Sequence, residues 1–200
     1  MKSEEKVSKK VVVSVLILSI LIIIAIALSI YIFLNAPKKV KKETLEGGNI
    51  SLTYTDDECG LSISNVTAMS DAVGKKLDAA NLYFDFSVSV KLEDAKKVDY
   101  EIALIPDKSS TIDNSVVKVY LEKQKSGAFK EVLKPTIIKL SKEKSSLDSP
   151  KGSMLLYKET STKSTNNNYR LRMWVSDSSQ LQLSELDNYK AKIVVKGKAS

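Results

Sequence analysis

The feature that most constrains how this chain can fold is a run of 24 residues without a charge, Val11–Leu34. A helix rises about 1.5 Å per residue, so a run of this length is enough to cross the roughly 30 Å hydrocarbon core of a bilayer. We therefore expect a transmembrane helix at residues 11–34, preceded by a cytoplasmic tail at residues 1–10. Signal peptides have a shorter apolar stretch, and Pro37 after Ala36 suits cleavage poorly, so the sequence favours an uncleaved signal anchor.

Lysines flank this run on both sides, and their distribution bears on orientation. The tail holds four lysines, and four more follow the run: Lys38, Lys39, Lys41 and Lys42. We expect these last four to contact anionic lipid head groups. The positive-inside rule favours neither orientation, but long domains cross a membrane largely regardless of charge. Because the rest of the chain is rich in Ser, Thr, Asn and β-branched residues, we expect a single-pass protein of the cell membrane with its C-terminal domain extracellular.

The net charge of +7 is concentrated around the predicted helix. Two of these charges belong to the tail and four to the lysines after the helix, which leaves about one for residues 43–200. Proteins that bind nucleic acids carry a basic stripe, often with interleaved aromatic residues. The sequence has no such stripe, and we expect no nucleic-acid partner.

The residue types that are missing exclude several kinds of chemistry. The chain has no histidine, which removes His-based acid–base catalysis, Ser-His-Asp and Cys-His nucleophiles, and nearly all zinc catalysis. Its single cysteine, Cys59, allows no intramolecular disulfide and is a buried side chain, a possible free thiol or an intermolecular bridge. The acidic triplet Asp56–Glu58 fits a solvated turn better than a cation site, because no spaced ligand loop accompanies it. We expect no cofactor, metal ion or catalytic residue.

Beyond residue 48 the apolar residues recur with period two, which indicates β-strands. The clearest case is Leu82–Leu92, where Leu82, Phe84, Phe86, Val88 and Val90 form the predicted buried face. Eight further segments show weaker strand patterns: Ile50–Tyr54, Leu61–Val66, Val98–Leu104, Val116–Leu121, Ile137–Leu140, Met154–Tyr157, Tyr169–Val175 and Tyr189–Val195. We therefore expect a Lys-rich stalk at residues 35–48 and a β-sandwich domain at residues 49–200.

Strands at this spacing predict an all-β, antiparallel, Ig-like β-sandwich of about 7–9 strands. Turn residues at Lys125–Gly127 and Asn166–Asn168 separate neighbouring strands, and Asp71–Ala80 has room for one or two helical turns. Leu186–Tyr189 is either a tyrosine corner of the Ig kind or, the interpretation we favour, an aromatic residue at the start of a strand.

The most distinctive segment is Tyr169–Val175, which holds the only Trp. In a strand, Arg170, Arg172 and Trp174 share one face, and we expect Trp174 to be partly exposed beside Arg172, close enough for a cation–π contact. Such side chains either seal a sheet face or form an interaction patch, since Trp, Tyr and Arg are enriched at binding hot spots. We favour the sealing role.

Two late segments carry a resemblance to known proteins. One is Tyr-x-Leu-Arg-x-Trp (Tyr169, Leu171, Arg172, Trp174), and the other is Tyr-x-Ala-x-Ile-x-Val (Tyr189, Ala191, Ile193, Val195). With the Lys-rich tail and one apolar run, the chain resembles uncharacterised single-span, membrane-anchored surface proteins of low-GC Gram-positive (Firmicutes-like) bacteria. This resemblance implies a surface location and no particular activity.

These observations predict a non-enzymatic surface or envelope interaction protein whose partner is an unknown protein or envelope component. One alternative is a subunit of a surface fibre or biofilm-matrix-type assembly, which would pair exposed strand edges between chains. The other is an envelope hydrolase that uses carboxylates alone and needs two acids about 5–9.5 Å apart in a cleft.

Overall fold

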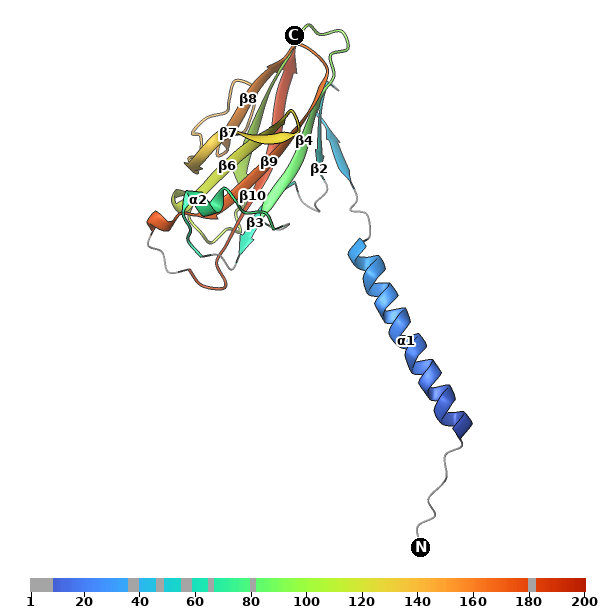
Figure 1. Cartoon of the computed structure of the whole chain (residues 1–200). Helices are drawn as coiled ribbons and strands as arrows, with labels where there is room; N and C mark the ends of the chain where they lie inside the picture. The colour runs from blue at the N-terminus through green and yellow to red at the C-terminus, as the bar shows by residue number, and fades with distance from the viewer. Residues whose placement is uncertain are drawn as a thin grey trace. The chain divides into compact units, whose positions relative to one another are not determined.

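The chain divides into two compact units, Met1–Lys38 and Lys39–Ser200, which are described separately. A computed structural model describes residues 9–35, 40–45, 49–54, 59–64, 67–79, 82–179 and 183–200. In the first unit, helix α1 extends over Lys9–Asn35, and all its side chains from residue 13 to residue 29 are exposed. The helix predicted at residues 11–34 is thus confirmed as a helix (Figure 1). Its membrane-spanning role is not supported, because no helix in the described part of the chain is long and apolar enough to cross a membrane.

The second unit is a mostly β domain, as the period-two pattern predicts. Its ten strands in the described residues are β1 (Lys41–Thr44), β2 (Ile50–Tyr54), β3 (Gly60–Ser64), β4 (Tyr83–Val90), β5 (Val98–Pro106), β6 (Val117–Lys125), β7 (Ala128–Ile137), β8 (Met154–Ser161), β9 (Thr165–Val175) and β10 (Asn188–Ala199). The short helices are α2 (Asp71–Gly74) and the 3₁₀ turns η1 (Asn114–Val116) and η2 (Asp177–Ser179).

The strands form two antiparallel sheets that pack face to face as a sandwich (Figure 1). The six-stranded sheet has the order β1-β2-β4-β9-β6-β7, and the four-stranded sheet has the order β3-β10-β5-β8. From β3 to β10 the pairing is nested: β3 pairs with β10, β4 with β9, β5 with β8 and β6 with β7. One long hairpin wrapped into two sheets gives this order, which is that of a jelly roll. The sandwich is therefore confirmed, whereas the Ig-like strand order is wrong.

The core lies between the sheets and is centred on β4. Phe84, Phe86, Val88 and Val90 are buried, as predicted, while Leu82 precedes the strand and is only half-buried. The Phe86 ring stacks on Phe84 with centroids 5.6 Å apart and on Tyr169 of β9 with centroids 5.3 Å apart. Side chains that alternate along β4 thus build the stack that joins it to its neighbour.

Two edge strands lie where the sequence did not predict them. β1 falls within the expected stalk at residues 35–48 and pairs with β2 from Lys41 to Thr44. β7 pairs with β6 instead of the segment expected at Ile137–Leu140, of which only Ile137 is in a strand. Both strands lie at the edges of the sheet, where backbone pairing with one neighbour suffices and Lys and Pro residues are tolerated.

Three local predictions have mixed outcomes. The turn at Lys125–Gly127 joins β6 to β7, and its residues Ser126 and Gly127 have φ angles of 52° and 84°, as tight hairpin turns require. Asn166–Asn168 lies inside β9 and is not a turn. Tyr189 does not form a tyrosine corner, because its hydroxyl donates to the Asn114 side chain at 2.6 Å; it is the second residue of β10.

Candidate functional site: the open edge of β10

The predicted patch residues Arg170, Arg172 and Trp174 alternate along β9 and lie on the outer face of the six-stranded sheet, as expected. Trp174 is fully buried, however, so the predicted partial exposure is wrong. The connection from β3 to β4 covers it: α2 lies over this end of β6 and β9 (Figure 1). A Cβ added to Gly74 of α2 would lie 2.2 Å from Trp174 Cδ2, so this glycine allows the helix to rest directly on the indole ring.

Residues 67–79, which we name the cap, are fastened to the sheet by several contacts. The backbone N–H of Met69 donates to Val175 at 2.9 Å, and Lys118 donates to the carboxylate of Asp71 at 2.7 Å. Arg172 Nε donates to the Leu77 carbonyl at 2.6 Å. The cap therefore seals the sheet face over Trp174.

The two arginines have partners other than Trp174. Arg170 forms a bidentate pair with Asp85, with both N–O distances 2.7 Å, and its guanidinium lies 4.0 Å from the Tyr83 ring centroid. Arg172 pairs with Glu122 and has its cation–π contact with Tyr83, at 5.9 Å. The predicted Arg172–Trp174 contact is thus replaced, because the cap occupies the space over the indole ring. The geometry is that of a sealed sheet face, and a binding role for these residues stays a prediction.

A polar network links the two sheets near the N-terminal half of β9. Lys123 of β6 donates to both carboxylate oxygens of Glu159 of β8, at 2.6 Å and 2.5 Å. The Tyr100 hydroxyl donates to the same carboxylate at 2.6 Å and lies 2.6 Å from the Tyr169 hydroxyl. Burial raises the pKa of both tyrosines, so they stay protonated at neutral pH. The network holds a buried lysine in an ion pair and fastens the sheets together.

The network predicts a loss of stability in acid. Burial opposes ionisation of Glu159, but hydrogen bonds from Lys123 and Tyr100 outweigh it and hold its pKa below the ordinary 4.5. The stabilisation is therefore fully present above pH 4.5 and is lost as the pH falls through the lower pKa of the folded state. We expect the free energy of unfolding to fall as the pH is lowered below 4.5, and to fall less in Glu159→Gln, as measured by urea unfolding at each pH. Equal pH dependence in both proteins would contradict this role of Glu159.

Glu101 contributes to the same pH range and explains why Glu159→Gln should remove only part of the effect. Its carboxylate is fully buried under the loop between β7 and β8, where it accepts hydrogen bonds from Ser145 and from the Ser149 N–H. Burial opposes ionisation, but these bonds and Lys158, 3.2 Å away, hold the pKa of Glu101 below its ordinary value.

Cys59 is a free, half-buried thiol packed against the core. Its Sγ lies 3.4 Å from the Ile193 carbonyl, and burial raises its pKa to about 12. A thiol with so high a pKa holds little thiolate at neutral pH and reacts slowly. The acidic triplet Asp56–Glu58 lies outside the described residues.

The site that the sequence did not reveal is an edge of β10. On one side, β5 pairs with β10 from Ala191 to Ala199, but on the other side β3 pairs with it only from Asn188 to Lys192. The last bond on that side joins the Ile193 N–H to the Cys59 carbonyl at 2.8 Å. Within the described residues no strand continues the pairing beyond Ile193, so this stretch of β10, residues 195–199, is an open edge.

The open edge presents backbone N–H and C=O groups toward the side of β10 that has no neighbouring strand in the described residues. Successive residues of an antiparallel strand direct their N–H and C=O groups to opposite neighbours. The backbone N–H and C=O groups of Val195 and Gly197 point to the same side of β10 as those of Ile193. They therefore face the side that lacks a strand. Unpaired backbone of this kind is a template for a further strand.

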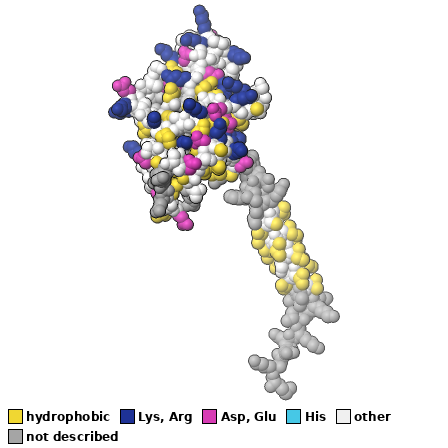
Figure 2. Space-filling view, turned by 60° about the vertical axis from the view of Figure 1, so that its left-hand side comes forward, with side chains coloured by type: hydrophobic (Ala, Val, Ile, Leu, Met, Phe, Trp, Pro, Cys, Tyr) yellow, Lys and Arg dark blue, Asp and Glu magenta, His cyan; other side chains and the backbone are white. Residues whose placement is uncertain are grey.

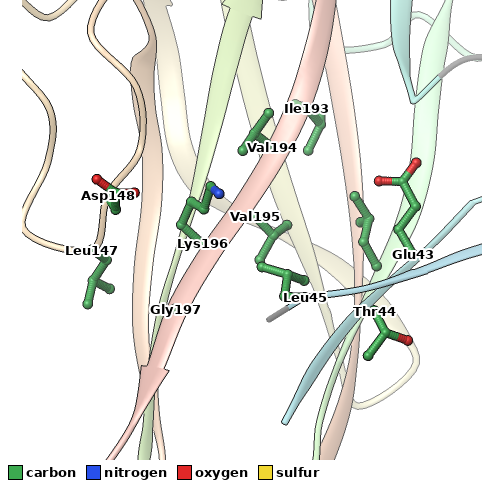
Figure 3. A pocket seen from close by; sticks show the side chains of 11 residues that line it. Glu43, Thr44, Leu45, Leu147, Asp148, Ile193, Val194, Val195, Lys196 and Gly197 are labelled. Atoms are coloured by element: carbon green, nitrogen blue, oxygen red, sulfur yellow. The ribbon is translucent and has the colours of Figure 1, made fainter. Parts of the chain in front are cut away.

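A pocket of about 300 Å³ lies along this stretch of β10. Figure 3 shows β10 between two groups of residues. Glu43 and Thr44 of edge strand β1, with Leu45 just after it, lie on one side, and Leu147 and Asp148 of the loop between β7 and β8 lie on the other. Leu45 and Leu52 of the opposite sheet and Val195 of β10 supply apolar walls. Both acidic groups are engaged, since Glu43 accepts from the Tyr54 hydroxyl at 2.6 Å and Asp148 pairs with Lys144 at 3.0 Å.

Basic and acidic side chains are interspersed over the face of the domain seen in Figure 2, as its near-neutral charge leads one to expect. The sequence matches no protein-family model and no curated protein. The class is therefore defined by fold and site: a jelly-roll β-sandwich with an open strand edge, preceded by an apolar helix.

Proposed function

We propose that this protein is a non-enzymatic, membrane-anchored interaction module of the bacterial cell surface, of the kind that low-GC Gram-positive bacteria carry. Its extracellular domain binds a partner by accepting an extended segment at the open edge of β10. The observation that carries the proposal is the unpaired stretch from Val195 to Ala199, since main-chain hydrogen bonds along such an edge supply affinity in strand addition.

The anchoring part of the proposal rests on the sequence. Val11–Leu34 has no charge, and four lysines, Lys38, Lys39, Lys41 and Lys42, follow within reach of anionic head groups. Figure 2 shows mainly hydrophobic side chains along the described part of α1, and those from residue 13 to residue 29 are exposed. Exposed apolar side chains favour contact with lipid over contact with water.

The non-enzymatic part is supported by the state of two carboxylates, the buried Glu101 and the half-buried Glu159. Glu101 and Glu159 each pair with a lysine, and both have lowered pKa values. A carboxylate-only hydrolase needs a general acid whose pKa is raised so that it holds a proton at working pH. These two carboxylates are ionised there, so they fit ion pairs within the fold better than catalysis.

The same edge favours one second candidate, a subunit of a surface fibre or matrix assembly. In that case the added strand would come from another copy of this chain. The two functions differ in their concentration dependence: a fibre subunit associates with itself as its concentration rises, and an interaction module stays monomeric until its partner is present.

Amide hydrogen exchange on the full chain tests strand addition. In cell envelopes, the Val195 and Gly197 amides should exchange more slowly than in the protein purified in detergent, because a bound strand accepts their hydrogen bonds. The Val194 and Lys196 amides face β5 and serve as internal controls that should not change. Equally fast exchange in both samples would refute binding at this edge. The extracellular placement is tested separately by adding protease. A domain that resists protease on intact cells but is digested in inverted vesicles would refute that placement.

A further inference from the structure

We infer that the segment accepted at the open edge of β10 is acidic, with Asp or Glu residues alternating with apolar ones along an extended stretch of a partner protein. The inference rests on the proposed function, because it names the chemistry of the partner at that same edge. It is carried by charges and by side-chain alternation on β10 and its neighbours.

The outer face of β10 carries a lysine at nearly every second position: Lys190, Lys192, Lys196 and Lys198. Lys190 and Lys192 lie where β3 pairs with β10, whereas Lys196 and Lys198 lie on the open stretch. A strand added there would place its outward side chains about 5 Å from these two lysines, where opposite charges attract.

The strand on the paired side shows which pattern suits β10. In β5, Glu101 lies opposite Lys196 and Asp99 opposite Lys198, while Tyr100 between them is buried. These acids are already engaged elsewhere: Asp99 lies 3.2 Å from Lys97, and Glu101 lies 3.2 Å from Lys158. Within the described residues, neither Lys196 nor Lys198 forms a salt bridge, and Asp148, the acid whose charge Lys196 senses, is paired with Lys144. Both lysines can therefore accept an incoming carboxylate.

The inward side of the added strand would face the apolar walls of the pocket. Leu45 and Leu52 lie on one side and Val195 on the other, so apolar side chains at alternate positions would be buried there. Acidic residues outward and apolar residues inward together define the expected segment.

The lysines also argue against a second copy of this chain as the occupant. The edge strands of the six-stranded sheet are β1, with Lys41 and Lys42, and β7, with Lys130, Lys134 and Pro135. In each strand two lysines outnumber a single glutamate, Glu43 in β1 and Glu131 in β7, so pairing with the lysines of β10 brings together more like charges than opposite ones. Like charges directly opposite each other destabilise a strand pair. A heterologous acidic segment meets no such repulsion.

Two synthetic peptides test the inference on the full chain in neutral detergent. The first copies residues 98–105 (VDYEIALI), and the second carries Asn and Gln in place of its two acids. We expect the acidic peptide to bind about three- to tenfold more tightly in fluorescence anisotropy, and this advantage to shrink as salt is added. The double variant Lys196→Gln with Lys198→Gln should lose the preference, while the matched control Lys190→Gln with Lys192→Gln should keep it.

The outcomes separate the inference from the proposed function. Equal affinity for the two peptides, or a preference that survives Lys196→Gln with Lys198→Gln, would overturn the acidic chemistry while leaving strand addition intact. Failure of both peptides would overturn the inference, and hydrogen exchange in envelopes would still decide the proposed function. Oligomers that form as the protein concentration rises and dissociate when either peptide is added would identify a second copy of the chain as the occupant. That result would also overturn the inference of an acidic partner segment.

Discussion

Replacing Phe84 with alanine should lower the free energy of unfolding by about 3–5 kcal/mol, the range found for large-to-small changes in packed cores. Phe84 is fully buried and lies between Phe86, 5.6 Å away, and Tyr54, 6.1 Å away, measured between ring centroids. Its removal leaves a cavity that three aromatic rings from three strands, β2, β4 and β9, cannot collapse into without breaking their stack. Urea unfolding of the full chain in detergent, followed by near-ultraviolet circular dichroism, measures the change.

Phe129→Ala is the matched control, because it removes the same side chain from a half-exposed position on edge strand β7. Phe129 contributes a contact with the Arg170 guanidinium, 4.5 Å from its ring centroid, and little buried area. We expect a loss of about 1 kcal/mol or less. A loss at Phe84 as small as that at Phe129 would mean that the face of β4 assigned to the core is the wrong one.

The sequence predicts the strands whose side chains alternate, because burial of one face imposes period two. Ile50–Tyr54 is predicted with its observed bounds, and the buried face of β4 is correct from Phe84 to Val90. β7 escapes prediction because an edge strand buries neither face fully, and its Lys and Pro residues match no strand pattern. β1 escapes for the same reason.

Asn166–Asn168 shows how tertiary pairing overrides a local preference. Three consecutive asparagines favour a turn, since their side chains bond readily to nearby backbone. In the sandwich, Asn168 and Asn166 instead accept hydrogen bonds from Ser87 and Ser89 of β4, at 2.6 Å and 2.8 Å. No pattern within β9 indicates these partners, which lie about 80 residues away.

The candidate site was beyond prediction for a related reason. The open edge exists because β3 is shorter than β10, and which two strands pair is a property of the nested topology. The sequence offers one local signal, Gly60 at the start of β3, where an added Cβ would lie 2.0 Å from the Ala191 carbonyl oxygen. This glycine allows close approach to β10, but its role becomes visible only when the partner strand is known.

The period-two pattern placed Trp174 on the correct face of β9, but the predicted exposure of its side chain was wrong. Alternation along a strand shows to which face of the sheet a side chain points. It does not show whether another segment packs over that face. The cap that buries Trp174 is a connection between β3 and β4 without an apolar pattern of its own. Trp174→Ala should therefore lower the free energy of unfolding by about 3–5 kcal/mol, as the loss of a large buried aromatic does. Because this is the only Trp, the variant is measured by circular dichroism.

A double-mutant cycle with Gly74 tests whether the cap is what seals the ring. In the unmodified chain, Gly74→Ala places a methyl group 2.2 Å from the indole ring, so the cap must move, at a cost of about 1–3 kcal/mol. In Trp174→Ala the same methyl group enters the space that the ring has left, so the cost should vanish or become a gain. The two changes are thus expected to couple strongly, as residues in contact do. Additive losses would show that the cap does not rest on Trp174, and unfolding measurements on the four proteins of the cycle decide between these results.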